Sequence, residues 1–550
     1  MPTVTLNYDT IVKGLGRSIS DKQLKHYITM LGTDLEHLGR QGITVEVFPN
    51  RPDMLSDYGF LRALRSFIGV DRGIRQYRAK RSGKRVYVRK SVSKVRPYTA
   101  CAIVKNLRLN DESIAQIIQL QEKLHISHCR NRSKAAIGLY PSDRIRYPIE
   151  FVALKPDQVS FIPLGSDQLM TGFEILRKHK TGREFAHLLA GKSLFPVFRD
   201  SRGEILSIPP IINSEFTGKV TRETTEVFIE CSGFDISFLS KLLNIIVCEL
   251  ADMGGELYSI DVIYPDRKLV FPDLKPKSME LDESYVEKLL GARVNIKEYL
   301  ERMGYSYDNG LVSIPCYRTD VLHQIDLVED IAIAHGYNNF KPELPNITTV
   351  ANENPIEEFK RKIAELLIGL GFVEVFTFNI TNNELQHKLM GLKGNIIEFS
   401  NYKSREQSGL RSWMIPSLME ALRLNKNNEY PQFIFDIGYV FRLDSKEETG
   451  ILEQEMLGLV MAGNQQDYTR VRQVAEYIFS VFGLSAELKP TSHRSFIQGR
   501  VAKIKAGECE LGMLGEIHPK VLNNFKIEMP VAALQLNITK LFNLVTKKQP

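Results

Sequence analysis

The sequence predicts a soluble multidomain protein of mixed α/β (α+β) class, and three observations support this prediction. The chain has 550 residues, more than one hydrophobic core usually organises, so three to five domains are expected. Apolar residues make up 43% of the chain and charged residues 25%, which is typical of folded globular proteins. Segments with helical spacing of apolar residues also alternate with segments that have the period-two pattern of strands.

The first domain is expected at residues 1–75, as a small α/β unit. Ser20 and Gln23 form a capping-box pattern at the start of a helix, and Gly32 is well placed to end that helix. Residues 43–47 alternate between apolar and polar types and predict a strand.

The sequence contains no sign of export or of a membrane span. It has no run of about 18 uncharged apolar residues. Residues 1–5 lack the basic region and apolar stretch of a secretory signal, which favours the cytoplasm. The six cysteines include no Cys-x-x-Cys pair and are interpreted as reduced core residues. The net charge of +7 permits a polyanionic partner without requiring one.

The strongest charge bias lies at residues 72–96, and residues 76–96 are expected to connect the first domain to the next. Lys and Arg recur there with no acidic residue between them, and Tyr77 is interleaved. One interpretation is a contact with the phosphates of an RNA. The other is a solvated connector in which Val86 and Val88 pair in a sheet. Both interpretations remain open at the level of the sequence.

Three further domains are expected. Residues 97–265 alternate helical and strand patterns and predict one larger α/β domain. Residues 270–345 predict two helices with a strand between them, the second helix beginning near Thr319. Residues 350–550 predict another α/β domain. Its first helix has an apolar face that comprises Phe359, Ile363, Leu366, Leu367 and Leu370.

An acidic cluster lies on the helix expected after Thr319. Asp326, Glu329 and Asp330 are spaced i, i+3 and i+4 and share a face, with Asp320 near the expected N-cap. Like charges at this spacing repel, and a hard divalent cation such as Mg²⁺ would offset the repulsion. An ordinary solvated acidic face has the same spacing, and spacing alone favours that interpretation.

A second polar group follows an apolar strand in the domain expected at residues 97–265. Asn213, Ser214 and Glu215 end this stretch, and several threonines follow. Such side chains could line a pocket that positions a water and a small polar substrate. A β-hairpin whose threonines favour strand structure is the alternative, and it is favoured without further information. The sequence contains no phosphate-binding glycine loop, dinucleotide fingerprint or nucleophile elbow.

Several motifs resemble those of phenylalanyl-tRNA synthetase β subunits of the short archaeal type. They follow the family order along nearly the whole chain and comprise residues 49–53 with Tyr58 and Gly59, residues 314–320, 326–332 and 335–337, and residues 410–418, 435–441 and 512–519. The resemblance implies a small N-terminal domain, an editing domain, a B5-like domain with a metal-binding helix, and a C-terminal domain with a class II synthetase-like antiparallel sheet.

The resemblance also implies a ligand set for magnesium. The family's Mg²⁺ ligands are acidic residues of the helix just described. Residue by residue, they correspond to Asp320, Asp326, Glu329 and Asp330. The site is expected close to the contact with the α subunit.

The family's editing domain hydrolyses tyrosyl-tRNA made in error. A phenylalanine pocket cannot strongly reject an isostere that only adds a hydroxyl, so a second site is needed. The candidates are Asn213, Ser214 and Glu215, then residues 130–132 and Asp235. The sequence departs from the family at one nearby place, where Tyr140 and Pro141 replace the His and Asp of many relatives.

The C-terminal domain resembles the class II catalytic fold without its ATP-binding motifs. Residues 433–436 lack the Phe-Arg-x-Glu pattern that grips ATP. ATP and phenylalanine are therefore expected to bind an α subunit, in an α₂β₂ tetramer that charges tRNA-Phe. A stand-alone tRNA-binding scaffold and a trans-editing hydrolase are the alternatives.

Overall fold

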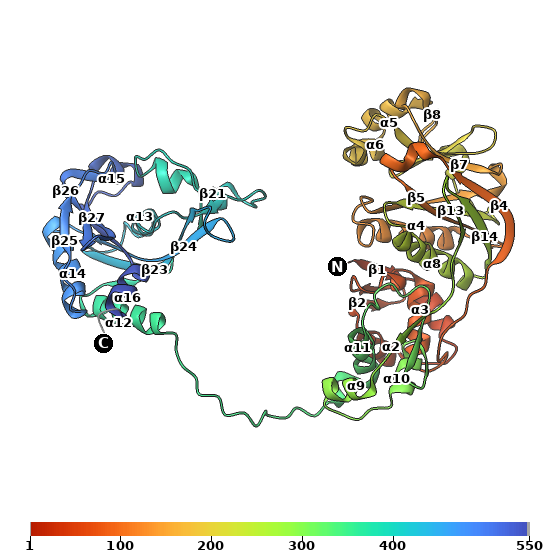
Figure 1. Cartoon of the computed structure of the whole chain (residues 1–550), viewed down its shortest axis with the longest axis horizontal. Helices are drawn as coiled ribbons and strands as arrows, with labels where there is room; N and C mark the ends of the chain where they lie inside the picture. Colours follow the sequence, from red (N-terminus) through yellow and green to blue (C-terminus); the bar gives the residue numbers. More distant parts are fainter. Residues whose placement is uncertain (1, 547–550) are drawn as a thin grey trace. The chain divides into compact units, whose positions relative to one another are not determined.

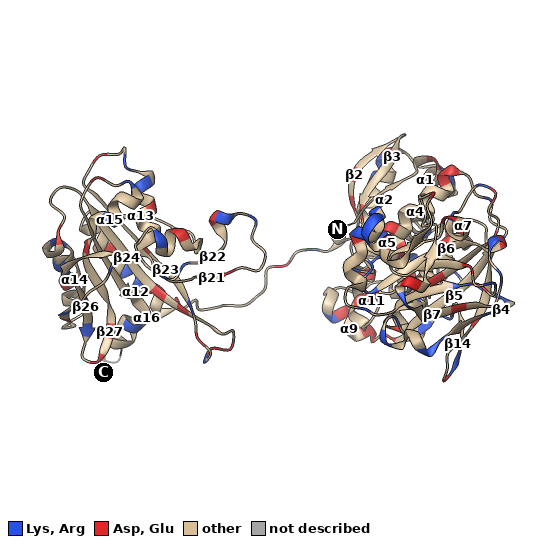
Figure 2. Cartoon of the chain, turned by 90° about the horizontal axis from the view of Figure 1, so that it is seen from above, with Lys and Arg blue, Asp and Glu red and all other residues tan. Residues whose placement is uncertain are grey.

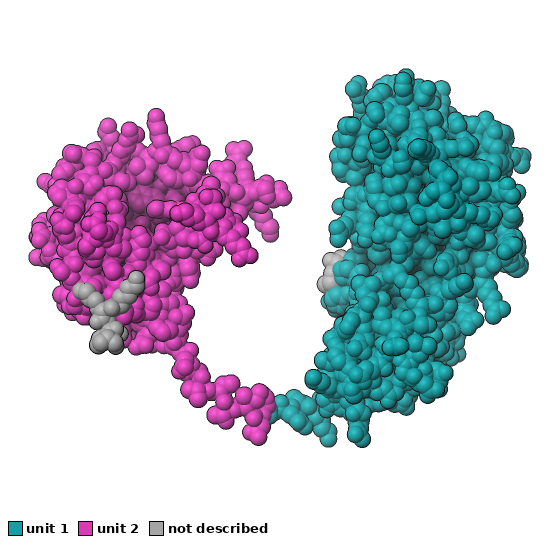
Figure 3. Space-filling model, viewed as in Figure 1, with its two compact units in different colours: residues 1–344 teal, residues 345–550 magenta. Residues whose placement is uncertain are grey.

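The computed structural model describes residues 2–546, and the chain divides into two compact units, residues 1–344 and 345–550 (Figure 3). Residues 341–354 contain no helix or strand. No helix in the described part of the chain is long and apolar enough to cross a membrane. All six cysteines are free thiols.

A small three-stranded antiparallel sheet begins unit 1. Its strands pair in the order β1 (Thr3–Leu6), β3 (Gly42–Glu46) and β2 (Asp34–Gly39). The accompanying helices are α1 (Tyr8–Gly14), α2 (Asp21–Met30) and α3 (Asp57–Phe67). The predicted capping box of α2 is confirmed, because Ser20 and Gln23 each accept the other's backbone N–H. Gly32 follows the helix with φ of +89°, a conformation that glycine adopts readily.

A ten-stranded sheet forms the middle of unit 1 (Figure 1). Its strands run in the order β12 (Ile212–Asn213), β11 (Ile205–Ile208), β10 (Phe195–Arg199), β7 (Ile149–Leu154), β4 (Lys80–Val88), β14 (Glu256–Ile263), β5 (Tyr98–Lys105), β13 (Val227–Gly233) and β6 (Ala135–Pro141), with β15 (Lys268–Phe271) paired to β14. Helix α8 (Ile236–Asp252) packs on β5 and β13, and α4 (Asp111–Ile126) packs on β6. All seven residues of β13 are buried, as in strands that are covered on both faces.

The segment expected as a connector, residues 76–96, contains an inner strand of this sheet. Strand β4 pairs in parallel with both β14 and β7. Val86 and Val88 are buried in it, while its basic residues are exposed. The sheet-pairing interpretation of these two valines is therefore confirmed. The segment is part of unit 1, not a free link between separate units.

Residues 277–335 add another three-stranded antiparallel sheet with three helices. The strands pair in the order β16 (Lys277–Glu280), β18 (Leu311–Ile314) and β17 (Ser306–Asp308). The helices are α9 (Glu283–Leu290), α10 (Ile296–Arg302) and α11 (Gln324–His335). The prediction that the last helix begins near Thr319 is wrong, because its N-cap is His323.

The later start of α11 changes which residues it buries. Asp326 accepts the backbone N–H groups of Leu322 and His323, and these contacts fold the chain into the helix at that point. Ile325, in the first turn of the helix, is 44% exposed. Leu327 and Ile331 lie in the core instead.

Unit 2 is built on one seven-stranded sheet. Its order is β19 (Val373–Glu374), β23 (Gln432–Leu443), β24 (Ile451–Ala462), β28 (Val531–Asn537), β27 (Cys509–Ile517), β26 (Phe496–Ala506) and β25 (Glu487–Pro490). The helices include α12 (Pro355–Gly369), α13 (Ile415–Leu424), α14 (Tyr468–Val481), α15 (Pro519–Phe525) and α16 (Ile538–Thr546). Leu457 and Leu459 of β24 join the core with α12, α14 and α16, whereas Val460 joins the core with α13 and α15. The alternation of the strand therefore gives the sheet a core on each face.

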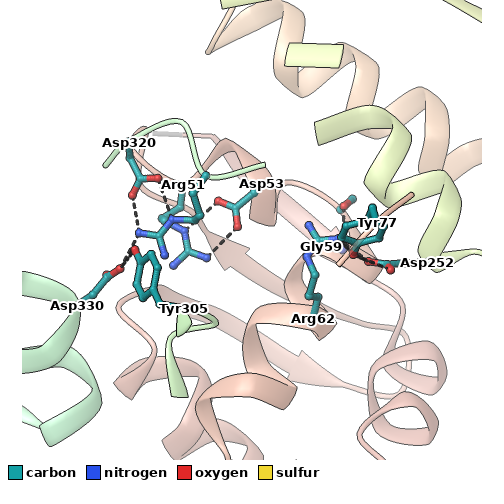
Figure 4. Close-up of polar contacts among 11 residues, drawn as sticks. Arg51, Asp53, Gly59, Arg62, Tyr77, Asp252, Tyr305, Asp320 and Asp330 are labelled. Carbon is teal, nitrogen blue, oxygen red and sulfur yellow. Dashed lines mark hydrogen bonds and ion pairs between the residues drawn. The ribbon is translucent and has the colours of Figure 1, made fainter. Parts of the chain in front are cut away.

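Arg318 forms a buried ion-pair cluster with α11 (Figure 4). Its guanidinium donates to Asp320 at 2.7 and 2.8 Å and to Asp330 at 2.7 Å. The Tyr305 hydroxyl also donates to Asp330. Only 2% of the Arg318 side chain is exposed. These contacts fasten α11 to the loop that precedes it.

Two further buried pairs lie in the same part of unit 1, and Figure 4 shows Arg51 and Asp53 beside the cluster and Arg62 with Asp252 apart from it. Arg51 and Asp53 form a bidentate pair at 2.8 and 2.9 Å. Arg62 of α3 pairs with Asp252 at the end of α8 and lies over the ring of Tyr317, 4.0 Å from its centroid. The pair of Arg62 and Asp252 connects α3 to α8, whereas the pair of Arg51 and Asp53 is local.

We predict that Arg318→Met lowers the free energy of unfolding by about 3–5 kcal/mol, because Asp320 and Asp330 would stay buried without a cation. Urea unfolding of the full chain, followed by circular dichroism, measures this change. The matched control is Arg293→Met, since Arg293 is 89% exposed and only contacts Glu287 at 3.5 Å. The control should change stability by less than about 0.5 kcal/mol. An equal, small effect of both variants would show that the buried pairs contribute no net stability.

Candidate functional site

The candidate site is a cavity of about 400 Å³ between α4, β6 and the turn that joins β11 to β12. Most of its lining is apolar, and the polar lining residues are Gln121, Glu122, His125, Arg132, Thr181, Asn213, Lys219 and Glu230. The side chains of Glu122 and Lys219 are 51% and 57% exposed, whereas Glu230 is buried. The cavity therefore runs from a solvent-facing rim to a buried carboxyl group, a shape typical of small-molecule sites.

Glu230 forms the buried end of the cavity. It lies on β13, and burial raises its pKa to about 8. The carboxyl group is therefore mostly protonated at neutral pH, and it can donate as well as accept a hydrogen bond. Its Oε2 has no hydrogen-bond partner among the described residues.

The side chain of Tyr140 lies against this buried end. Its hydroxyl is 2.7 Å from Ser207 Oγ and 3.3 Å from both Asn213 Oδ1 and Glu230 Oε1. Gly138 is two residues back on β6, opposite Glu230. A Cβ at Gly138 would lie 2.3 Å from the Tyr140 hydroxyl. The absence of a side chain at Gly138 therefore leaves the space that the Tyr140 ring occupies along β6.

Arg132 and His125 shape another wall of the cavity. Arg132 donates to the Ile211 carbonyl at 2.9 Å and lies 3.3 Å from the Glu122 carboxylate. His125 Nε2 accepts the backbone N–H of Ile137 at 2.9 Å. Burial lowers the pKa of His125, which favours the neutral ring.

Only one of the three main editing candidates faces the cavity. Asn213 lines it, whereas Ser214 and Glu215 are not among the lining residues. Ser214 is buried. The Glu215 carboxylate accepts the Gly165 N–H at 2.8 Å and pairs with Lys219 at 2.6 Å, and the first of these contacts lowers its pKa. Ser214 and Glu215 therefore hold the turn that follows Asn213.

The remaining editing candidates lie in different surroundings. Of residues 130–132, only Arg132 lines the cavity. Asp235 is the N-cap of α8 and accepts the backbone N–H groups of Ser237 and Phe238. Sequence reasoning did not select Glu230 as a site residue. The available signal was a single acidic residue within the otherwise uncharged run Val227–Gly233.

The four predicted magnesium ligands lie near one another, but two of them are bound by Arg318. Asp320 and Asp330 both accept hydrogen bonds from its guanidinium. One oxygen of Asp326 accepts two backbone N–H groups at 2.8 Å. The side chain of Glu329 makes no hydrogen bond within the described residues, and its pKa is raised by partial burial and by Asp330, Asp326 and Asp320.

The chemistry of this donor set fits magnesium. As folded, no group of three or more His, Cys, Asp or Glu side chains within residues 2–546 is arranged to hold a metal ion. All four donors are nevertheless carboxylates, which are the ligands that Mg²⁺ prefers. Burial raises the pKa of Glu329, and repulsion from the neighbouring aspartates, which a divalent cation would offset, raises it further.

The basic residues at 72–96 fall into two groups. Some are already paired within unit 1: Arg75 contacts Asp252 at 2.9 Å, and Lys80 contacts Glu256 at 2.6 Å. Arg96 is buried and donates to Ser232. Figure 2 shows the same mixture of basic and acidic residues over unit 1. The exposed basic residues without an ion pair in the described chain are Arg78, Arg81, Lys84, Arg85, Lys90 and Lys94.

Comparison with known families and structures gives consistent results over both units. The phenylalanyl tRNA synthetase beta chain CLM domain matches residues 341–538, and the tRNA synthetase B5 domain matches residues 279–337. A crystal structure of an N-terminal fragment of the phenylalanyl-tRNA synthetase β-subunit from Pyrococcus horikoshii is similar, with a TM-score of 0.59 and 37% identity. It covers 61% of this chain and 99% of the fragment.

Full-length relatives extend the match. The chain is 38% identical to the phenylalanine–tRNA ligase beta subunit of Pyrococcus abyssi, over 98% of this chain and 100% of that protein. It is 36% identical to the subunit of the same name from Archaeoglobus fulgidus, over 99% of both. The resemblance seen in the motifs is confirmed, and the chain belongs to the phenylalanine–tRNA ligase β subunit family.

Proposed function

We propose that this chain works in the cytoplasm with an α subunit, in an α₂β₂ tetramer that uses ATP to attach phenylalanine to tRNA-Phe. The observation that carries the proposal is family membership over nearly the whole chain. It favours a synthetase subunit over a stand-alone RNA-binding scaffold or a trans-editing hydrolase. Co-expression with the α subunit from the same genome, followed by an aminoacylation assay, tests the proposal.

We assign ATP and phenylalanine binding to the α subunit. Strand β23 lacks the family's ATP-gripping pattern at residues 433–436. Asp436 of this strand is buried and pairs with Arg411 at 3.2 Å, and it accepts the Thr377 hydroxyl. Arg411 also donates to the Tyr439 carbonyl at 2.7 Å. Arg411 and Asp436 are therefore bound to each other and to their neighbours, and they stabilise unit 2.

An apolar patch on unit 2 supports a protein partner. We define the patch as Ile368, Val373, Phe376 and Phe378, which are 56%, 62%, 87% and 80% exposed. Val373 belongs to β19, the edge strand of the sheet. Large exposed apolar groups concentrated in one segment are typical of interaction surfaces. We propose that this patch contacts the α subunit.

We predict that Phe376→Ser with Phe378→Ser abolishes co-purification with the α subunit, because the contact would lose two large apolar side chains. Size-exclusion chromatography with light scattering measures the assembly. The matched control is Ile347→Ser with Val350→Ser, which removes apolar side chains that are 70% and 85% exposed outside the patch. Full assembly of the patch variant would place the interface elsewhere.

We propose that the cavity is the editing site. Hydrolysis there would add a water oxygen to the carbonyl carbon of the tyrosyl ester and break its bond to the tRNA ribose oxygen, which takes up a proton. Asn213 can hydrogen-bond the substrate or this water from the cavity wall. Ser214 and Glu215 act as positioning residues, because they hold the turn that follows Asn213. We assign no protein nucleophile.

We predict that Asn213→Ala slows the deacylation of tyrosyl-tRNA-Phe by the α–β complex roughly tenfold, through loss of a hydrogen bond to the reacting group. Glu215→Ala should slow it less, since Glu215 acts only through the turn. Phenylalanine charging should not change in either variant and serves as the internal control. An unaltered deacylation rate in Asn213→Ala would remove Asn213 from the site.

We propose that Mg²⁺ binds at the carboxylates of Asp326 and Glu329, with Asp320 and Asp330, which both accept from Arg318, as further acidic neighbours. Asp320 and Asp330 are already paired with Arg318. A bound cation would therefore stabilise the charged form of Glu329 more than that of either aspartate. The ion, when bound, would supply positive charge and not reaction chemistry. The acidic residues would hold it and thereby stiffen the start of α11.

We predict that Glu329→Gln lowers the magnesium content of the dialysed chain, measured by elemental analysis, and abolishes the rise in melting temperature on adding Mg²⁺. Glu329 does not contact Arg318, so the buried pairs stay intact. The matched control is Glu287→Gln on α9, whose metal content should not change. Equal metal content in the two variants would contradict the assignment.

We propose that the exposed, unpaired basic residues at 78–94 contact the phosphates of tRNA-Phe. Their positions on and beside β4 place them on a continuous stretch of chain. Arg96 is excluded from this role because it is buried against Ser232. Phosphate contacts of this kind weaken as salt concentration rises.

A further inference from the structure

A phenol, the side chain of Tyr140, lies directly behind the polar end of the cavity, against the lining residues Asn213 and Glu230. Its hydroxyl lies within hydrogen-bond distance of three polar groups, on Ser207, Asn213 and Glu230. Ser207 and Asn213 face each other across the β11–β12 pair, and Glu230 comes from β13. Three separate strands therefore direct polar atoms at one phenolic oxygen.

The surroundings of the ring hold it in this position. Tyr140 is fully buried, and its ring packs against Phe228, the residue opposite it on β13, at 5.8 Å between centroids. Gly138 provides the space through which the ring reaches Glu230. Apolar neighbours surround the ring, and hydrogen-bonding groups surround its hydroxyl. Together they form a complete binding site for a phenol.

A site that selects tyrosine over phenylalanine must hydrogen-bond the hydroxyl by which the two amino acids differ. At the end of this cavity, the groups that could bind such a hydroxyl, on Ser207, Asn213 and Glu230, already contact Tyr140. Asn213 and Glu230 also line the cavity itself, so Tyr140 competes directly with any ligand that reaches them.

We propose that Tyr140 is a specificity-determining residue whose phenol occupies the place of a ligand phenol, so that the cavity recognises tyrosine only when Tyr140 is displaced or removed. This inference rests on the proposed editing function for its ligand, mischarged tyrosine. The presence of a phenol subsite under Tyr140 can be tested without tRNA.

The first experiment measures the melting temperature of the full chain with p-cresol, which carries the side-chain ring and hydroxyl of tyrosine, and with toluene, which lacks the hydroxyl. In Tyr140→Ala we expect p-cresol to raise the melting temperature clearly more than toluene does, because removal of the ring opens a ligand-sized space beside Ser207 and Glu230. The wild-type chain should respond equally little to both. If Tyr140→Ala does not fold, Tyr140→Val, which suits a strand, takes its place.

The matched control is Tyr147→Ala. Tyr147 packs on the same Phe228 ring, 6.1 Å between centroids, but its hydroxyl contacts Ser142 and not Glu230. This variant also loses a phenol, which is half-buried, and it should show no preference for p-cresol over toluene. If the Tyr140 variants also show no preference, the inference is overturned.

The second experiment measures deacylation of tyrosyl-tRNA-Phe by the α–β complex. We expect Tyr140→Ala to hydrolyse it about tenfold faster than wild type, since a competing hydrogen bond is worth about 1.4 kcal/mol. If wild type is already as fast as the variant, the inference fails while the editing function stands. If neither hydrolyses the ester although p-cresol binds selectively, the editing function fails while the occupied phenol subsite stands.

Discussion

The buried pairing of Arg318 with Asp320 and Asp330 is the constraint on which the arrangement of unit 1 depends. Charged side chains buried this deeply are tolerated only when each has a partner and further hydrogen bonds. The loop before α11 must therefore bring Arg318 and Asp320 to the inner face of the helix. Arg62 then lies over Tyr317, the neighbour of Arg318, which connects α3 and α8 to the same cluster.

This constraint also explains the character of the acidic helix. Arg318 offsets the charge of the two inner aspartates, so the acidic surface that remains consists mainly of Asp326 and Glu329. Neither interpretation of the sequence, a solvated acidic face or a metal site, included the pairing of Asp320 and Asp330 with Arg318. The inner aspartates belong to the core, and the outer carboxylates are those available to a cation.

The cavity depends on a different feature, a carboxyl group that lies within a fully buried strand. Glu230 lies among apolar neighbours on β13, and its pKa rises because burial disfavours the charged form. Tyr140 satisfies one of its oxygens and leaves the other without a partner. A half-satisfied polar group at the end of a cavity is stabilised by any ligand that completes its hydrogen bonds.

Local sequence determined several features of this protein by itself. The capping box of α2, the buried valines of β4 and the family motifs depend on residues close together in the chain, so they could be read directly. Only the tertiary structure decided that α11 starts at Gln324, that Asp330 is buried on Arg318, and that Tyr140 meets Glu230. Tyr140 and Glu230 are 90 residues apart, and they meet because β6 pairs with β13. The physical reason is that strand pairing and charge burial join distant residues, whereas periodicity and capping report only on neighbours.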